Sequence, residues 1–297
     1  MWRAAALVVV VVAFPQPTTA WGFEAHKFIV DRMIELLPPD LKPLFVARRA
    51  FIVERAIDPD LWRNVWEDEA PNHFLDIDHD AFGPYPFLGL PRDYADAVQK
   101  FGRNFVHQQG LLPWRTSEFF GRLLREFESL KRTPPPGYAA DNIVLYAAVL
   151  AHYVSDGHVP LHAVVNYNGQ LTGQDGVHSR WEGELFERNR SSLKIAPPPL
   201  KPVTVPRDAM FDVLLASNRL AENVLAVDRQ AAEGREFYDD AYFDAFAKGT
   251  LSTLERRLND SISAVAAFIV GAWETAGKPA IPLEAERTPR RIRRPKQ

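Results

Sequence analysis

Apolar residues recur at helical spacing along most of the chain, and the alternation typical of strands is nearly absent. The pattern predicts helices over 21–37, 41–55, 93–108, 116–131, 141–156, 177–188, 207–229 and 240–275. We expect the helix over 116–131 to begin with Thr116 or Ser117 as its N-cap residue. A proline-bearing irregular segment over 56–90 and a loop rich in Gly and Asn over 166–175 interrupt the series. The sequence therefore predicts one all-α domain.

The stretch 141–156 is apolar on most sides and is expected to be the central buried helix. His152 and Asp156 are four residues apart in it, so they share one face. An ionised carboxylate buried there costs several kcal/mol unless it is paired or bound to a cation. A structural hydrogen bond between the two side chains and a shared metal ion both satisfy that requirement.

The first 20 residues have the layout of a secretory signal peptide, with Arg3, an apolar run and small residues before position 21. The run is too short to span a bilayer. Cleavage after Ala20 would leave Trp21 at the mature N-terminus, where its amine and carbonyl can chelate a metal ion. Otherwise Trp21 is a hydrophobic anchor. We expect export to a periplasmic or extracellular location.

Composition narrows the chemistry further. The chain has no cysteine, so any zinc ligands must come from His, Asp, Glu and terminal groups. Residues 287–297 hold six basic residues and no acid, and we expect 281–297 to form a disordered basic tail behind the domain at 21–280. Without this tail the body is acidic, which disfavours binding to long stretches of nucleic acid.

Five polar clusters punctuate the helices. They are His26; Asp60 with Arg63; His73 in Pro71-Asn-His-Phe-Leu-Asp76; His152-Tyr-Val-Ser-Asp156 continuing to Pro160-Leu-His162; and His178-Ser-Arg-Trp-Glu182. The pair His178 and Glu182 repeats the four-residue spacing, although on a polar helix it is also typical of a solvated pair. Nitrogen and oxygen ligands without sulfur favour zinc over manganese or iron.

Together with Trp21, these motifs resemble the zinc-dependent phospholipase C and single-strand nuclease (nuclease type I) superfamily. The similarity runs in order from Trp21 to Glu182, and that family is all-α. The resemblance implies three zinc ions. Trp21 and His26 would hold one. Asp60, His73 and His152 would hold a second, with Asp156 bridging these two, and His162, His178 and Glu182 would hold the third.

The same resemblance implies a hydrolase of phosphate esters, in which a zinc-activated hydroxide attacks phosphorus in line. Asp60 would also orient the attacking water, and Arg63 would bind phosphate unless it is an ordinary surface residue. Phe74 and Asp76 match residues that stack on a base and hydrogen-bond it. The substrate is expected to be single-stranded nucleic acid or a nucleotide, with phospholipid as the alternative. We expect a monomer without a stable protein partner.

Other interpretations remain open at this stage. Glu182 and the lack of cysteine are features of the phospholipase branch, whereas the Asp60/Arg63 pattern is nuclease-like. A non-catalytic protein that stores or senses zinc would use the same ligands. His158 is expected behind the ligands, while His79 and His107 are expected to be incidental. The adjacent His79 and Asp80 also match the pattern of HD-type phosphohydrolases, but that interpretation leaves Trp21, His178 and Glu182 unexplained.

Overall fold

The computed structural model describes residues 22–281. This part of the chain is helical without a single strand, which confirms the all-α prediction. The first half comprises α1 (Phe23–Met33), η1 (Ile34–Leu36), α2 (Lys42–Ala47), α3 (Arg49–Arg55), α4 (Asp58–Trp62), η2 (Glu67–His73), η3 (Asp80–Phe82), α5 (Tyr94–Phe101) and α6 (Arg103–Gln109). The second half comprises α7 (Leu112–Ser129), α8 (Ala139–Asp156), η4 (Pro160–Ala163), α9 (Val177–Ser179), η5 (Arg180–Glu184), α10 (Leu185–Asn189), α11 (Pro206–Ala232) and α12 (Asp240–Thr275).

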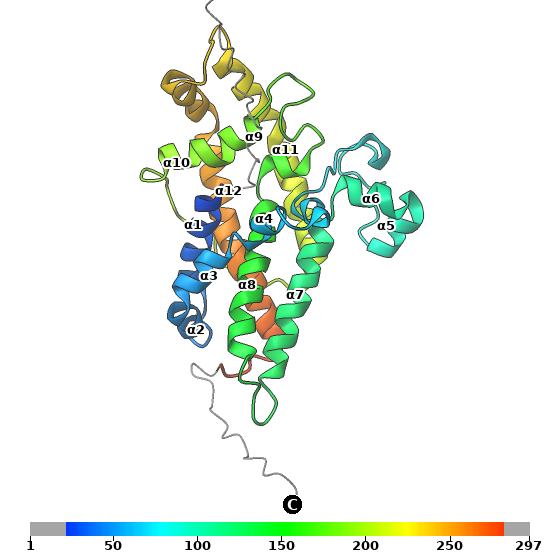
Figure 1. Ribbon diagram of the computed structural model, residues 1–297, viewed down its shortest axis with the longest axis vertical. Coiled ribbons are helices and arrows are strands. Elements are labelled where there is room, and N and C mark those ends of the chain that lie inside the picture. Colours follow the sequence, from blue (N-terminus) through cyan, green and yellow to red (C-terminus); the bar gives the residue numbers. More distant parts are fainter. Residues whose placement is uncertain (1–21, 282–297) are drawn as a thin grey trace, which may run out of the picture.

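Helix α8 is the centre of the fold, as its all-round apolar pattern predicts. It packs against α7 on one side, α3 on the other and the long helix α12 behind (Figure 1). Its side chains join one continuous hydrophobic core that also includes α1, α7, α11 and α12. Helices α5 and α6 stand out from one side of this body (Figure 1). One shared core of this kind defines a single domain.

Two predicted helices are each divided. The stretch 41–55 breaks at Arg48 into α2 and α3, and the stretch 93–108 breaks at Gly102 into α5 and α6. Gly102 has φ +86°, a left-handed conformation that glycine adopts without steric cost. The apolar periodicity continues across both breaks, which is why the pattern alone shows one helix in each case.

The predicted start of the helix over 116–131 is wrong. Helix α7 already begins at Leu112, with Pro113 in its first turn, where the missing N–H of proline costs nothing. Thr116 lies buried inside the helix and donates its hydroxyl to the carbonyl oxygen of Leu112 at 2.8 Å. A hydroxyl bonded to the carbonyl four residues back serves the helix interior, whereas a cap would accept from the backbone.

The segment 56–90 is less irregular than predicted, because it contains the short helix α4 and the 3-10 turns η2 and η3. Pro59 lies in the first turn of α4, where it is tolerated, and Asp60 follows it on the buried side.

Further along the chain, Arg180–Glu184 form a π-helical turn. As a result α9, η5 and α10 make one continuous helix where the sequence predicts a helix over 177–188. Among the helices of residues 22–281, none is both long and apolar enough to cross a membrane.

Candidate metal centre

Four helical elements bring five ligand-type side chains together at the C-terminal end of α8. They are His26 from α1, Asp60 from α4, His73 from η2, and His152 and Asp156 from α8. Each is at most 5% exposed. Two overlapping groups within this set have ligand atoms within 4.8 Å of one another: His26, Asp60 and His152, and His73, His152 and Asp156. We call these five residues the main cluster.

Asp156 is the hub of the main cluster. One carboxylate oxygen lies 3.4 Å from Nε2 of His26. The other lies 3.0 Å from Nδ1 of His73 and 3.3 Å from Nε2 of His152. The His26 and His152 rings stack with their centroids 4.0 Å apart. A carboxylate that touches imidazoles through both oxygens is placed to bridge two cations.

A second group, called here the third-metal group, lies beside the main cluster. His162 comes from η4, His178 from α9 and Glu182 from the π-helical turn, and all three are buried. One oxygen of Glu182 lies 3.0 Å from Nε2 of His178 and 3.7 Å from Nε2 of His162. His73, His162 and His178 line the same cavity, so the two groups face one site.

Hydrogen bonds from the outer ring nitrogens fix how the imidazoles point. Nδ1 of His152 donates to the carbonyl oxygen of Ala56 at 2.8 Å, which leaves Nε2 directed at the carboxylates. Nδ1 of His162 donates in the same way to the carbonyl oxygen of His73, and Nε2 turns toward Glu182. Such outer partners set the tautomer and orientation of metal-binding histidines.

Burial shifts the pKa values of these side chains, and the shifts affect their ability to bind metal. It lowers the pKa of His178 to about 4 and also lowers the pKa values of His73 and His152, so the rings are neutral at neutral pH. Neutral imidazole is the form that binds metal. Burial and the charge of Asp156 raise the pKa of Asp60 well above its usual value. Burial alone would do the same to Asp156, but the adjacent His152 holds its pKa well below the usual range.

Hydrogen bonds within the two groups leave some buried polar atoms without a partner, and a bound cation would satisfy them. Among the residues described, Oδ2 of Asp60 and Nε2 of His162 are buried and have no hydrogen-bond partner. Buried polar atoms are nearly always hydrogen-bonded, so one partnerless ligand-type atom in each of the two groups is consistent with a cation bound at each. Imidazole nitrogens with carboxylate oxygens and no sulfur are a donor set that suits zinc.

Eight of the nine predicted metal ligands are thus brought together. The ninth, Trp21, lies outside the described residues, as do the predicted cleavage site and the basic tail. The grouping differs in detail from the one that the resemblance implies, because Asp60 lies near His26 as well as near His73 and His152.

A cavity of about 210 Å³ opens onto both groups, and two aromatic rings border it. Phe74 and Tyr167 lie nearly parallel, at 20°, with their centroids 6.5 Å apart. This distance is at the long end of direct ring contact, about 4.5–7 Å. The two rings thus present near-parallel aromatic groups in the lining of the cavity.

Tyr167 was not predicted from the sequence, although an aromatic residue at the start of a Gly- and Asn-rich loop is a usable signal. Arg63 was predicted, and it lies at the cavity wall with Nη1 3.5 Å from Asp60. Its side chain is 30% exposed, so the guanidinium can reach a solvent-borne anion while it touches the cluster.

Asp76 lies two residues beyond Phe74, whose backbone is extended at φ −144° and ψ 171°. Leu75, between them, is buried in the core, and Asp76 is not among the residues that line the cavity. Oδ1 of Asp76 is buried without a hydrogen-bond partner in the described part of the chain. Burial, reinforced by the charge of Asp78, raises its pKa to about 7.

Three further histidines lie outside both groups. His158 is buried behind the ligands, where Nδ1 donates to the carbonyl oxygen of Val154 at 2.8 Å. His79 accepts from the backbone N–H of Ala81 and contacts the ring of Phe105. His107 lies 3.7 Å from the exposed Asp68.

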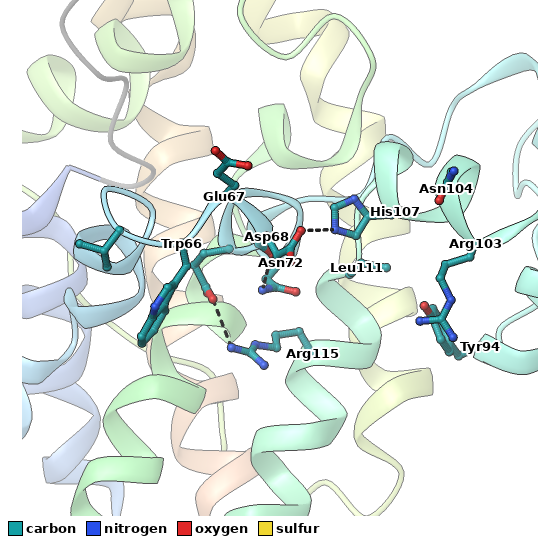
Figure 2. Close-up of a pocket in the computed structure, with 12 residues that line it drawn as sticks. Trp66, Glu67, Asp68, Asn72, Tyr94, Arg103, Asn104, His107, Leu111 and Arg115 are labelled. Atoms are coloured by element: carbon teal, nitrogen blue, oxygen red, sulfur yellow. Dashed lines mark hydrogen bonds and ion pairs between the residues drawn. The ribbon is translucent and has the colours of Figure 1, made fainter.

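A larger cavity, about 920 Å³, is lined in part by residues of η2 (Figure 2). Its wall includes Trp66, Tyr94, Arg103, His107 and Arg115. Two pairs of charged groups there are in contact: Arg115 donates to Glu69 at 3.2 Å, and His107 lies by Asp68 (Figure 2). Because its buried ligand-type atoms are paired, this larger cavity is a weaker candidate for a metal centre than the smaller one.

No protein-family model and no curated protein matches the chain. The fold and the site by themselves define the class: an all-α protein whose buried His, Asp and Glu side chains form adjacent groups able to hold metal ions.

Proposed function

We propose that the protein is an exported zinc-dependent phosphodiesterase that acts on single-stranded nucleic acid or nucleotides. The observation that carries the proposal is the position of the aromatic pair, Phe74 and Tyr167, in the lining of the cavity that the two candidate metal-binding groups share. Stacking on aromatic side chains is the usual way in which proteins hold single-stranded bases. The ordered motifs from Trp21 to Glu182, which resemble the phospholipase C and nuclease type I superfamily, support the same class.

The proposal gives each part of the site a task. The main cluster would hold two zinc ions, with Trp21 completing one ligand set, and the third-metal group would hold another. Bound zinc supplies positive charge for the phosphate oxygens and lowers the pKa of a coordinated water. Arg63 would bind a phosphate oxygen, since guanidinium–phosphate hydrogen bonds are short and strong. Asp60 would accept a hydrogen bond from the attacking water and so orient it.

Phe74 and Tyr167 would clamp a base, and Asp76 would hydrogen-bond its edge. With a pKa near 7, the Asp76 carboxyl can donate when protonated and accept when ionised. The cavity is small, and the body of the protein is acidic. Both features favour one or two nucleotides at a strand end over a long track.

A substrate panel on the mature protein tests the proposal. Single-stranded DNA, RNA, nucleoside 3′-monophosphates and phosphatidylcholine vesicles are each assayed with and without chelator. We expect hydrolysis of the nucleic-acid substrates, its loss with chelator and its recovery with zinc. Hydrolysis of the vesicles alone would assign the lipid branch instead, and no hydrolysis of any substrate would leave the non-catalytic zinc-binding alternative.

Tyr167→Ala tests the clamp. Stacking is worth about 1–3 kcal/mol per base, so KM for single-stranded substrates should rise roughly tenfold with little change in kcat. The matched control is Tyr138→Ala, which removes another exposed tyrosine beside the opposite end of α8. Equal kinetics in the two variants would remove the clamp from the mechanism.

Arg63→Ala separates the enzyme from a zinc store. Catalysis should fall by a factor of at least 100 while zinc content stays unchanged, because the guanidinium binds phosphate rather than metal. In a storage protein the substitution has no phosphate to lose and leaves every measured property unchanged.

A further inference from the structure

The third-metal group is carried by a helix whose opposite face is anchored by a buried cation. Arg180 lies two residues after His178 and two before Glu182, about half a helical turn from each. His178 lines the cavity with Glu182 in contact with it, while Arg180 points away toward Asp228 of α11. Its side chain is only 6% exposed.

Arg180 makes an unusually full set of contacts for a buried cation. Nε and Nη2 donate to one carboxylate oxygen of Asp228 on α11 at 3.1 and 2.9 Å. Nη1 donates to the carbonyl oxygen of Asp175 at 2.8 Å, and Nη2 also reaches that of Gln174 at 3.1 Å. The ring of Tyr238 covers the guanidinium, with its centroid 3.9 Å away.

Asp228 is tied in turn to other elements. The hydroxyl of Tyr242 on α12 donates to the oxygen that Arg180 binds. The side-chain amide of Gln174 donates to the other oxygen at 2.7 Å, and also to the carbonyl oxygen of Leu225 at 2.7 Å. The ion pair thus joins the helix of the third-metal group, the loop before it, α11 and α12 at one point.

Stability alone does not account for such a pair. Removing two charges from water costs several kcal/mol, and apolar residues of the same volume often stabilise a core as well or better. The ion pair also fixes the relative positions of the segments that it joins, and two neighbouring features depend on those positions. The turn Arg180–Glu184 is π-helical, a rare conformation found mostly at functional sites. The loop 166–176 carries Tyr167, whose ring contacts that of His178 edge to face, with the centroids 6.2 Å apart.

We propose that Arg180, through Asp228, is a positioning residue that sets the third-metal group and the Tyr167 side of the base clamp together. Its guanidinium hydrogen-bonds the carbonyl oxygens of Gln174 and Asp175 at the end of the loop. Through Asp228 it also fixes the side of the helix that faces away from the cavity. The part that concerns Tyr167 rests on the proposed function. The part that concerns metal does not, because it is measured as metal affinity.

The test is zinc binding by the full mature protein with Arg180→Lys and, separately, Asp228→Asn. Lysine keeps the charge but cannot reach Asp228 and both carbonyls at once. We expect one of the zinc ions to bind 10–100-fold more weakly, roughly the effect of losing an outer partner of a metal ligand, while the affinity of the others is unchanged. Chelator competition followed by elemental analysis gives the affinities and the number of ions.

Arg188→Lys is the matched control. Arg188 pairs with Asp240 of α12 at 2.7 Å from the same continuous helix, but both side chains are exposed and neither touches a ligand. It should bind zinc like the wild type. If a substitution at Arg180 or Asp228 prevents folding, Tyr242→Phe keeps the ion pair, removes one hydrogen bond to Asp228 and should weaken the same single ion less.

Two results would overturn the inference. One is wild-type zinc affinity at every site with only a lower melting temperature, which would make the pair purely structural. The other is equal weakening of all the ions, which would indicate general loosening of the fold. An absence of nuclease activity in the wild-type protein would reject the proposed function but would leave the zinc measurement as a valid test of Arg180.

Discussion

Burial acts on the imidazoles and the carboxyls of the site in opposite senses. It keeps His73, His152 and His178 neutral by lowering their pKa values, and so prepares them as ligands. The same burial raises the pKa of Asp60, which must lose a proton before it can hold a cation. Binding of a metal ion by these groups would therefore be coupled to proton release.

The effect of burial on a single carboxyl can be tested at Asp76, which is not a predicted metal ligand. Its pKa of about 7 in the folded protein exceeds the ordinary value of 3.8, so the folded state binds the proton more tightly than the unfolded state does. The free energy of unfolding should therefore fall as pH rises from about 4 to about 7 and then level off. Asp76→Asn removes this cost, and we expect it to stabilise the protein by about 1–2 kcal/mol at pH 8 and very little at pH 4.

Urea unfolding of wild type and variant at pH 4, 6 and 8 measures the difference. Asp80→Asn, at an exposed position nearby, is the control and should leave the pH dependence unchanged. A stability difference for Asp76→Asn that is the same at every pH would contradict the raised pKa.

At the scale of secondary-structure elements, the position of the short segment that carries His73, Phe74 and Asp76 is set by hydrogen bonds to the residues around the end of α6. The backbone N–H of Asp76 donates to the carbonyl oxygen of Gln109 at 2.8 Å, and that of Leu112 donates to Phe74 at 3.2 Å. Gly110 lies between these two bonds at φ +105°. A Cβ there would lie 2.2 Å from the carbonyl oxygen of Phe74, closer than any real contact.

Gly110→Ala should therefore displace Phe74 as well as strain the backbone. We expect a loss of about 2–4 kcal/mol in the free energy of unfolding, together with a higher KM for single-stranded substrates. Gly102→Ala is the control, since its φ is also positive at +86° but nothing lies within 4 Å of the added methyl. The difference between the two variants isolates the contact with Phe74, and equal losses would show that only backbone strain matters.

For the whole molecule, the candidate metal centre joins helices from both halves of the chain. α1, α4, η2 and α8 meet at the main cluster, and η4, α9 and η5 complete the site. Bound cations would cross-link these elements and neutralise buried carboxylates. Ligands that bind only the folded state stabilise it, by roughly 4 kcal/mol per site when free metal exceeds Kd a thousandfold.

Chelation should accordingly lower the melting temperature by roughly 10 °C or more, and zinc should restore it. Magnesium should restore little, because it prefers oxygen ligands and an octahedral site. Differential scanning calorimetry of the protein before chelation, after chelation and after each metal is added back measures the effect. A melting temperature that chelator leaves unchanged would mean that the groups hold no structural metal.

The sequence by itself determined the helical class, the central place of α8 and eight residues that the fold gathers into the candidate metal centre. Local periodicity encodes a helix, and four-residue spacing places His152 and Asp156 on one face of α8. The full set of ligand-type residues followed from the resemblance of the ordered motifs. Breaks and starts were harder to predict: the division at Gly102 and the start of α7 before Thr116 depend on how neighbouring segments pack, which periodicity does not record.

Only the tertiary structure decided which distant residues meet. Tyr167 contacts Phe74, and Arg180 contacts Asp228, because segments far apart in the chain pack against each other in the folded protein. Their spacing in sequence, 93 and 48 residues, carries no periodic signal that could have paired them. Residues close in the sequence can be paired from the local pattern, whereas contacts between distant segments depend on how the whole core packs.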